Sequence, residues 1–180
     1  MKKISLLIAV LFIIVNYSCE RDDICPENTP TTPRLIIDLY DLGDQETQKN
    51  VFDLRIQGVG NDNALPGFNV ASSANSIILP LRTDASSTQY KLHINYAIND
   101  NGTPDNPDDD FTEGNEDIIT ISYTTEEIYV SRACGYKTIF KNVSIILDTN
   151  DTAPWILLRE AINDNQSVED ETTTHFNIFH

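Results

Sequence analysis

The chain has 180 residues and a formal net charge of −16, from 28 acidic side chains against 12 lysines and arginines. A chain this acidic repels phosphate backbones, which argues against nucleic acid as a partner, and it does not dock on anionic lipid through charge. The length suits one domain with a hydrophobic core of its own.

Residues 1–18 have the three-part layout of an export signal. Two lysines precede an apolar run over residues 4–15, which is short for a mature transmembrane helix. Ser18-Cys19 then resembles the lipobox of bacterial lipoproteins, although the two residues before Ser18 depart from its usual pattern. We expect cleavage before Cys19 and lipid on that cysteine, and the alternatives are an ordinary secretory peptide or a retained anchor helix.

Residues 19–33 form a lipidated tether, acidic at first and then rich in proline, and residues 34–180 form a single domain. Lipid on Cys19 leaves Cys25 and Cys134, in a compartment where disulfides persist. We therefore predict a Cys25–Cys134 disulfide, with two free thiols as the alternative. The extended chain from Cys19 to Cys25 reaches only about 20 Å, so the domain would lie close to the membrane.

Short alternating or apolar segments predict strands along the rest of the chain. In residues 51–59, the side chains of Phe52, Leu54 and Ile56 share one face, and residues 89–98 alternate most regularly, with His93 on the polar face. The other predicted strands cover 35–40, 76–81, 118–124, 136–140, 143–147, 155–161 and 174–179, and residues 126–134 fit a strand or a helical turn.

Eight or nine short strands with polar connections indicate an all-β fold. Pro80 makes the strand over residues 76–81 an edge or bulged strand. We predict an antiparallel β-sandwich of the immunoglobulin-like or Greek-key type, and a small β-barrel is the alternative.

An acidic segment without basic residues, 99–117, lies between two of the predicted strands. Its prolines favour a long, solvated hairpin loop, and the spacing of its acids does not match an EF-hand. Oxygen ligands at this density could still hold calcium. The candidate ligands are Asp100, Asp105, Asp108, Asp109 and Asp110.

The sequence contains no catalytic constellation, and we expect neither enzymatic activity nor a cofactor. It lacks a Gly-x-Ser-x-Gly elbow, and a glycosidase carboxylate pair cannot be picked out from 28 acids. The spacing of His93, His175 and His180 does not fit a zinc site and favours surface or terminal positions. Trp155 and the tyrosines could form a platform for sugars, but core packing is the simpler explanation.

Three segments together resemble one family of proteins: Cys25-Pro26 leading into residues 29–37, the stretch 129–137, and the terminal residues 178–180. The chain resembles an uncharacterised family of short bacterial envelope lipoproteins, classed as a domain of unknown function. The resemblance implies an exported, lipid-anchored domain in which Cys25 and Cys134 recur. It points to an outer-membrane protein as a partner and supplies no activity.

We therefore expect a lipoprotein that lipid on Cys19 holds in the outer membrane, on its surface-exposed or periplasmic face. Residues 20–23 resemble the signal that sends some lipoproteins to the cell surface, and a solvated linker is the alternative. The expected function is a non-enzymatic binding or assembly module that works with another outer-membrane component. The alternatives are a calcium- or carbohydrate-binding surface module and a hydrolase of envelope glycans.

Overall fold

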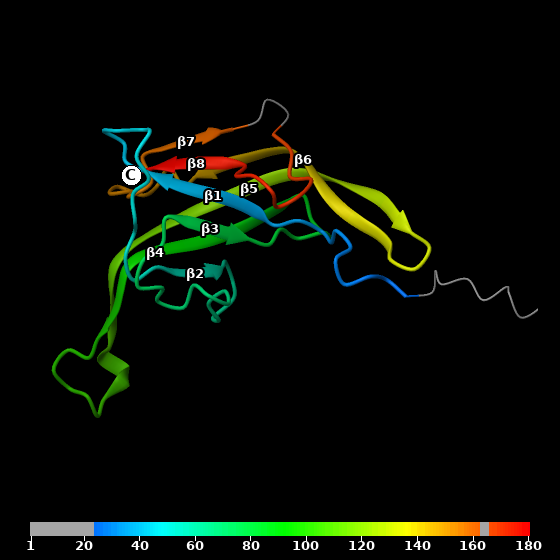
Figure 1. Cartoon of the computed structure of the whole chain (residues 1–180). Coiled ribbons are helices and arrows are strands. Elements are labelled where there is room, and N and C mark those ends of the chain that lie inside the picture. Colours follow the sequence, from blue (N-terminus) through cyan, green and yellow to red (C-terminus); the bar gives the residue numbers. More distant parts are fainter. Residues whose placement is uncertain (1–23, 163–165) are drawn as a thin grey trace, which may run out of the picture.

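The computed structural model describes residues 24–162 and 166–180, which form two four-stranded sheets packed face to face (Figure 1). The predicted β-sandwich is confirmed, and within the described chain the two sheets do not close into a barrel. The predicted signal segment 1–18 and Cys19 lie outside the described residues. No helix in the described part of the chain is long and apolar enough to cross a membrane.

The first sheet has the strand order β3-β1-β8-β7. Its strands are β1 (Leu35–Tyr40), β3 (Ser76–Leu79), β7 (Leu158–Ala161) and β8 (Phe176–Phe179). Strand β3 lies at the edge, as Pro80 predicts. The pairing in this sheet is antiparallel except at the centre, where β1 and β8 run parallel because the two ends of the domain meet there.

The second sheet has the order β2-β4-β5-β6 and contains the longest strands. These are β2 (Arg55–Gly58), β4 (Ser87–Asn99), β5 (Phe111–Ser131) and β6 (Gly135–Leu147). Residues 126–131 continue β5, and the predicted strands 136–140 and 143–147 are one strand. The sequence pattern divides them because a bulge interrupts the strand at Asn142, where a φ of 52° shifts the register against β5.

Alternate side chains of the two sheets fill the core between them. Leu35, Ile37 and Leu39 of β1 are fully buried against residues of the second sheet such as Leu92 and Ile121. Burial of this apolar surface is the main favourable contribution to folding. The strands therefore follow the predicted period of two over much of their length, with exceptions where two adjacent residues are buried, as at Ile139 and Phe140.

The predicted alternation over residues 51–59 is wrong at Phe52, whose side chain is 54% exposed. Asp53 has a φ of 46°, which breaks the extended backbone, so Val51 is buried in place of Phe52. Leu54 and Ile56 are buried as predicted. Positive φ at an aspartate is uncommon, and a period-two pattern cannot reveal it.

A second irregularity turns the end of β4 out of register. Asn95 has a φ of 52° and lies in a bulge, so Ile98 is exposed although the pattern places it with buried Tyr90. Opposite this bulge, a Cβ atom on Gly114 would lie only 2.3 Å from the carbonyl oxygen of Ile94, and the φ there is +107°. Only glycine fits this close approach of the two strands.

Asp117 lies within β5 rather than in the acidic loop, which spans only residues 100–110. Its carboxylate is buried and accepts hydrogen bonds from the backbone N–H groups of Trp155 at 3.2 Å and Ile156 at 2.8 Å. Burial raises the pKa of Asp117, and the two backbone hydrogen bonds oppose that rise. The Trp155 indole also donates to the carbonyl of Leu92 at 3.1 Å, so these bonds fix the segment before β7 on the second sheet.

An Asp117→Ala variant tests this connection. It would leave two buried N–H groups without acceptors, and we expect the free energy of unfolding to fall by about 2–4 kcal/mol in urea denaturation. Asp108→Ala, at an exposed position in the acidic loop, is the control and should change stability by less than about 0.5 kcal/mol. Equal stability of the two variants would contradict this role for Asp117.

Candidate functional site

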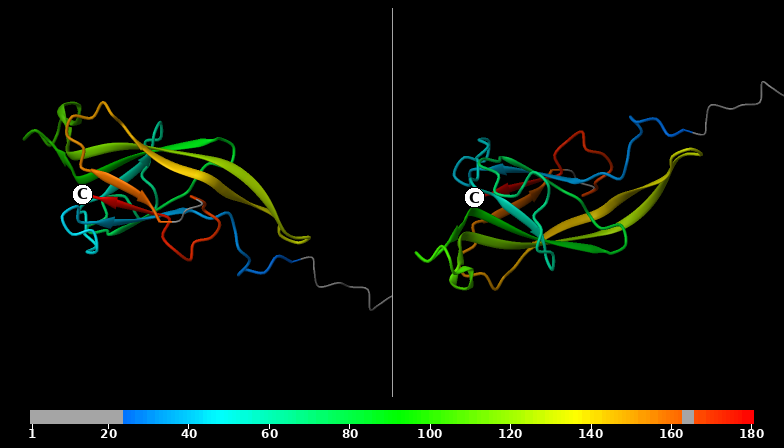
Figure 2. Two further views of the ribbon diagram at one scale, coloured as in Figure 1. Left: turned by 90° about the horizontal axis from the view of Figure 1, so that it is seen from above. Right: turned by 90° about the horizontal axis from the view of Figure 1, so that it is seen from below.

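The two ends of the sandwich differ in what they carry. The β5–β6 hairpin reaches beyond the other strands at the end where the described chain begins, and the acidic loop extends from the opposite end (Figures 1 and 2). The C-terminus lies toward the end with the acidic loop (Figure 1). We call the end with the β5–β6 hairpin tip the tether end. It consists of residues 24–34, which we call the tether, the hairpin tip 129–136 and the loop 169–172.

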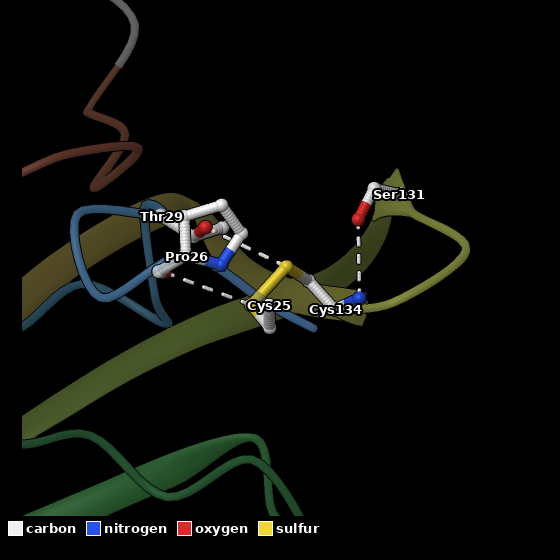
Figure 3. Close-up of a disulfide and its surroundings, with 5 residues drawn as sticks. All are labelled: Cys25, Pro26, Thr29, Ser131 and Cys134. Atoms are coloured by element: carbon white, nitrogen blue, oxygen red, sulfur yellow. Dashed lines mark hydrogen bonds between the residues drawn. A yellow bond between two sulfur atoms is a disulfide. The ribbon is translucent and has the colours of Figure 1, made fainter. Parts of the chain in front are cut away.

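A disulfide between Cys25 and Cys134 joins the tether to the hairpin tip (Figure 3), as the sequence predicts. The two Cα atoms are 4.9 Å apart, and the cysteines are separated by 109 positions in the chain. The backbone N–H of Cys134 donates to Ser131 Oγ at 3.1 Å and closes the turn, while Thr29 Oγ1 lies 3.5 Å from the Cys134 sulfur. The tether is therefore a fixed part of this end.

The tether then runs back along the outer edge of β6. Thr138 donates its backbone N–H to Thr32 Oγ1 at 3.1 Å, and further along β6 the backbones of Phe140 and Val168 exchange two hydrogen bonds. An uncovered edge strand presents unpaired backbone groups that other chains can add to. The tether and the segment around Val168 therefore cover this edge of the second sheet.

An ion pair fixes the point where the tether enters β1. Arg34 donates from its backbone N–H and its Nε to Glu171 Oε1, both at 2.8 Å, and from Nη2 to Glu171 Oε2 at 2.5 Å. These hydrogen bonds from Arg34 are the largest cause of the lowered pKa of Glu171. Because both side chains are partly exposed, the pair contributes more to geometry than to stability.

His175 joins the same loop to β1 from inside the protein. Its Nδ1 accepts the backbone N–H of Ile36 at 3.0 Å, so the ring is neutral and its Nε2 donates to the carbonyl of Asp170 at 3.1 Å. Burial is the largest cause of the lowered pKa of His175. The expectation of surface histidines is wrong for His175 and also for His93, which packs edge-on against Tyr96.

A shallow cleft of about 620 Å³ lies between the tether and the loop 169–172. Four of the charged side chains around it, those of Arg34, Lys137, Asp170 and Glu171, already have partners within the protein. Besides the Arg34–Glu171 pair, Lys137 donates to the carbonyl of Glu169 at 3.0 Å, and Asp170 accepts from the backbone and hydroxyl of Thr172. The cleft therefore offers a ligand mainly the hydroxyl groups of the tether and the carboxylate of Glu27.

Two exposed tyrosines distinguish the hairpin tip from the rest of the sheet. Tyr129 and Tyr136 face each other across β5 and β6, with ring centroids 5.4 Å apart, and their exposed fractions are 58% and 65%. Trp155, a candidate for a sugar platform by sequence, is buried in the core, as core packing predicts. The sequence did not predict the tyrosine pair, because Tyr129 lies within residues 126–134, which fit either a strand or a helical turn.

The calcium candidates lie at the opposite end from the tether. Asp100 accepts the backbone N–H of Gly102 at 3.1 Å, and Asp109 accepts the Thr103 hydroxyl at 2.8 Å beside the short 3₁₀ helix Pro107–Asp109. Two candidates thus support the loop's own conformation. In residues 24–162 and 166–180, no group of three or more histidine, cysteine or acidic side chains is placed to hold a metal ion.

Comparison with known proteins adds one finding. A family model described as "Family of unknown function (DUF6452)" matches residues 53–180, which include both long hairpin strands and Cys134 but not the tether. No curated protein and no solved structure matches the chain. The resemblance to an uncharacterised family is confirmed to this extent.

The buried histidine predicts a pH dependence of stability. The folded-state pKa of His175 lies below its ordinary value of 6.5. The stability that the neutral ring provides is therefore complete above pH 6.5 and is lost as the pH falls below 6.5. We expect the melting temperature to drop between about pH 7 and about pH 5, and His175→Gln to reduce that drop because glutamine does not titrate. Burial also lowers the pKa of His180, so this residue accounts for part of the drop in melting temperature that remains in the variant. An unchanged slope in His175→Gln would contradict the neutral, buried ring.

The disulfide predicts a loss of stability on reduction. Opening a loop that spans 109 positions should lower the free energy of unfolding by about 2–4 kcal/mol, mainly by releasing the unfolded chain. A Cys25→Ser/Cys134→Ser variant should match the reduced wild-type protein in urea denaturation and should not respond to reductant. A wild-type protein that is insensitive to reductant would show that the bond is absent.

Proposed function

We propose that this protein, which belongs to the family of unknown function DUF6452, is a lipid-anchored module of the bacterial outer membrane that binds or supports another envelope component. The lipid would be attached to Cys19. The observation that carries the proposal is the covalent connection between the segment that follows Cys19 and the tip of the β5–β6 hairpin.

This connection suits an anchor because it would hold the folded domain close to the lipid. Cys25 follows Cys19 by only six positions, and an extended chain of this length spans about 20 Å. Beyond Cys25, the hydrogen bond from Thr138 to Thr32 and the Arg34–Glu171 pair hold the tether along the domain. A lipid on Cys19 would therefore hold the tether end toward the bilayer and leave the acidic end facing away from it.

The surface that faces away from the bilayer supports a binding role. Strand β7 forms the edge of the first sheet, and the side chains of Leu157, just before the strand, and Leu158, its first residue, are 53% and 41% exposed. Edge strands with exposed apolar side chains are surfaces on which a partner protein can add a strand. An outer-membrane protein, the partner to which the family resemblance points, would reach this surface with a part that extends beyond the bilayer.

The lipid attachment is tested by a Cys19→Ala variant. In cells fed labelled palmitate, we expect the wild-type protein to carry the label, and the variant to lose it and to retain the uncleaved residues 1–18. The Cys25→Ser/Cys134→Ser variant should stay labelled, because those cysteines serve the disulfide. Undiminished labelling of Cys19→Ala would contradict the proposed anchor.

The binding role is tested by mild crosslinking of intact cells, followed by purification of the protein under denaturing conditions. We expect a crosslinked envelope protein, and less of it from a Leu157→Asp/Leu158→Asp variant, since charges on the β7 edge oppose strand addition. Phe111→Asp, an equally exposed apolar position in the second sheet, is the control. Recovery of the protein without any crosslinked partner would count against a binding module.

A further inference from the structure

We infer that the Tyr129–Tyr136 pair contacts the headgroup region of the lipid bilayer and sets the orientation of the domain on the membrane. This inference rests on the proposed lipid anchor at Cys19, and it adds a second contact with the membrane, made by side chains of the folded domain. The partner is the lipid surface itself rather than another protein.

The position of the tyrosines follows from the regular pairing at the end of the hairpin. Without a bulge between Thr125 and Tyr129, the cross-strand pairs alternate between the two faces of the hairpin, so Tyr136 shares a face with Phe140. Phe140 is fully buried in the core and packs against Tyr123. The core-facing side of the hairpin thus continues to the tip, where the other sheet no longer covers it (Figures 1 and 2).

The tether brings this uncovered face close to the membrane. Cys134 is two residues from Tyr136 and is bonded to Cys25, six residues after the proposed lipid attachment. The hairpin tip therefore stays within about 20 Å of the anchor, and such a short connection gives a high effective concentration of the tip at the bilayer. Under that condition, a weak contact suffices to favour one orientation.

The chemistry of the tip matches the interface and does not depend on charge. Tyrosine rings, with an apolar body and a polar hydroxyl, are enriched at the level of lipid headgroups. Ile24, next to the disulfide, is 81% exposed, and Arg132 is exposed at the turn. Because the chain carries a net charge of −16, a long-range attraction to anionic lipid would fail, whereas a short-range aromatic contact remains favourable.

The test uses the full lipidated protein in vesicles of phosphatidylethanolamine and phosphatidylglycerol whose acyl chains carry bromine, which quenches nearby indoles. A Tyr129→Trp variant places an indole at the tip, and a Phe111→Trp variant places one at an exposed position beside the acidic loop. Trp155 is buried in both variants and gives a common background. We expect bromolipid to quench the fluorescence of Tyr129→Trp, and the emission of this variant to lie at shorter wavelength on vesicles than in solution. The fluorescence of Phe111→Trp should show neither change.

Two results would overturn the inference in distinguishable ways. If mass spectrometry shows lipid on Cys19 but the emission of Tyr129→Trp is no more quenched than that of Phe111→Trp, the tip does not reach the bilayer and the anchor still stands. If Cys19 carries no lipid and the protein does not float with the vesicles, both the anchor and the inference fail. Circular dichroism of each variant confirms that the exposed substitutions leave the fold intact.

Discussion

The disulfide between Cys25 and Cys134 constrains both sheets at once. The tether that it fixes leads directly into β1, at the centre of the first sheet, while Cys134 belongs to the longest hairpin of the second. The bond therefore links the two layers at the tether end, where Arg34 and His175 add a shorter set of polar contacts between β1 and the loop before β8. Without the disulfide, only the hydrogen bond from Thr138 to Thr32 and the contacts of Arg34 and His175, among the tether contacts described above, would hold the tether to the domain.

The opposite end of the sandwich is held by different means. Asp117 and the indole of Trp155 fix the segment before β7 to the second sheet, and the ring of His180 packs edge-on against Trp155. Lys49 donates to the C-terminal carbonyl of His180 at 2.8 Å, so the last residue of the chain is part of the folded structure. The two ends thus have separate supports. A change at the tether end need not disturb the surface proposed to meet a partner, since sites far apart without shared contacts act nearly independently.

Sequence reasoning succeeded where local periodicity decides the structure and failed where single backbone angles do. The strand over residues 35–40, the edge position of the strand before Pro80 and the disulfide follow from pattern and cysteine count. The exposure of Phe52 and the merging of two predicted strands depend on positive φ angles at Asp53 and Asn142, which no periodicity encodes. The parallel β1–β8 pairing, the buried Asp117 and the exposed tyrosine pair result from tertiary contacts between distant segments. These contacts cannot be read from any one stretch of sequence.

The central claim is that a lipid-bearing tether is bonded to the hairpin tip. Tryptic mapping of the protein from isolated membranes, without reductant, tests this claim most directly. Cleavage after Arg21, Arg34, Arg132 and Lys137 separates residues 19–21 from the two disulfide cysteines. We expect a lipidated peptide 19–21, and a peptide 22–34 that stays joined to peptide 133–137 until reductant is added. An unmodified Cys19, or peptides 22–34 and 133–137 recovered apart with free thiols, would contradict it.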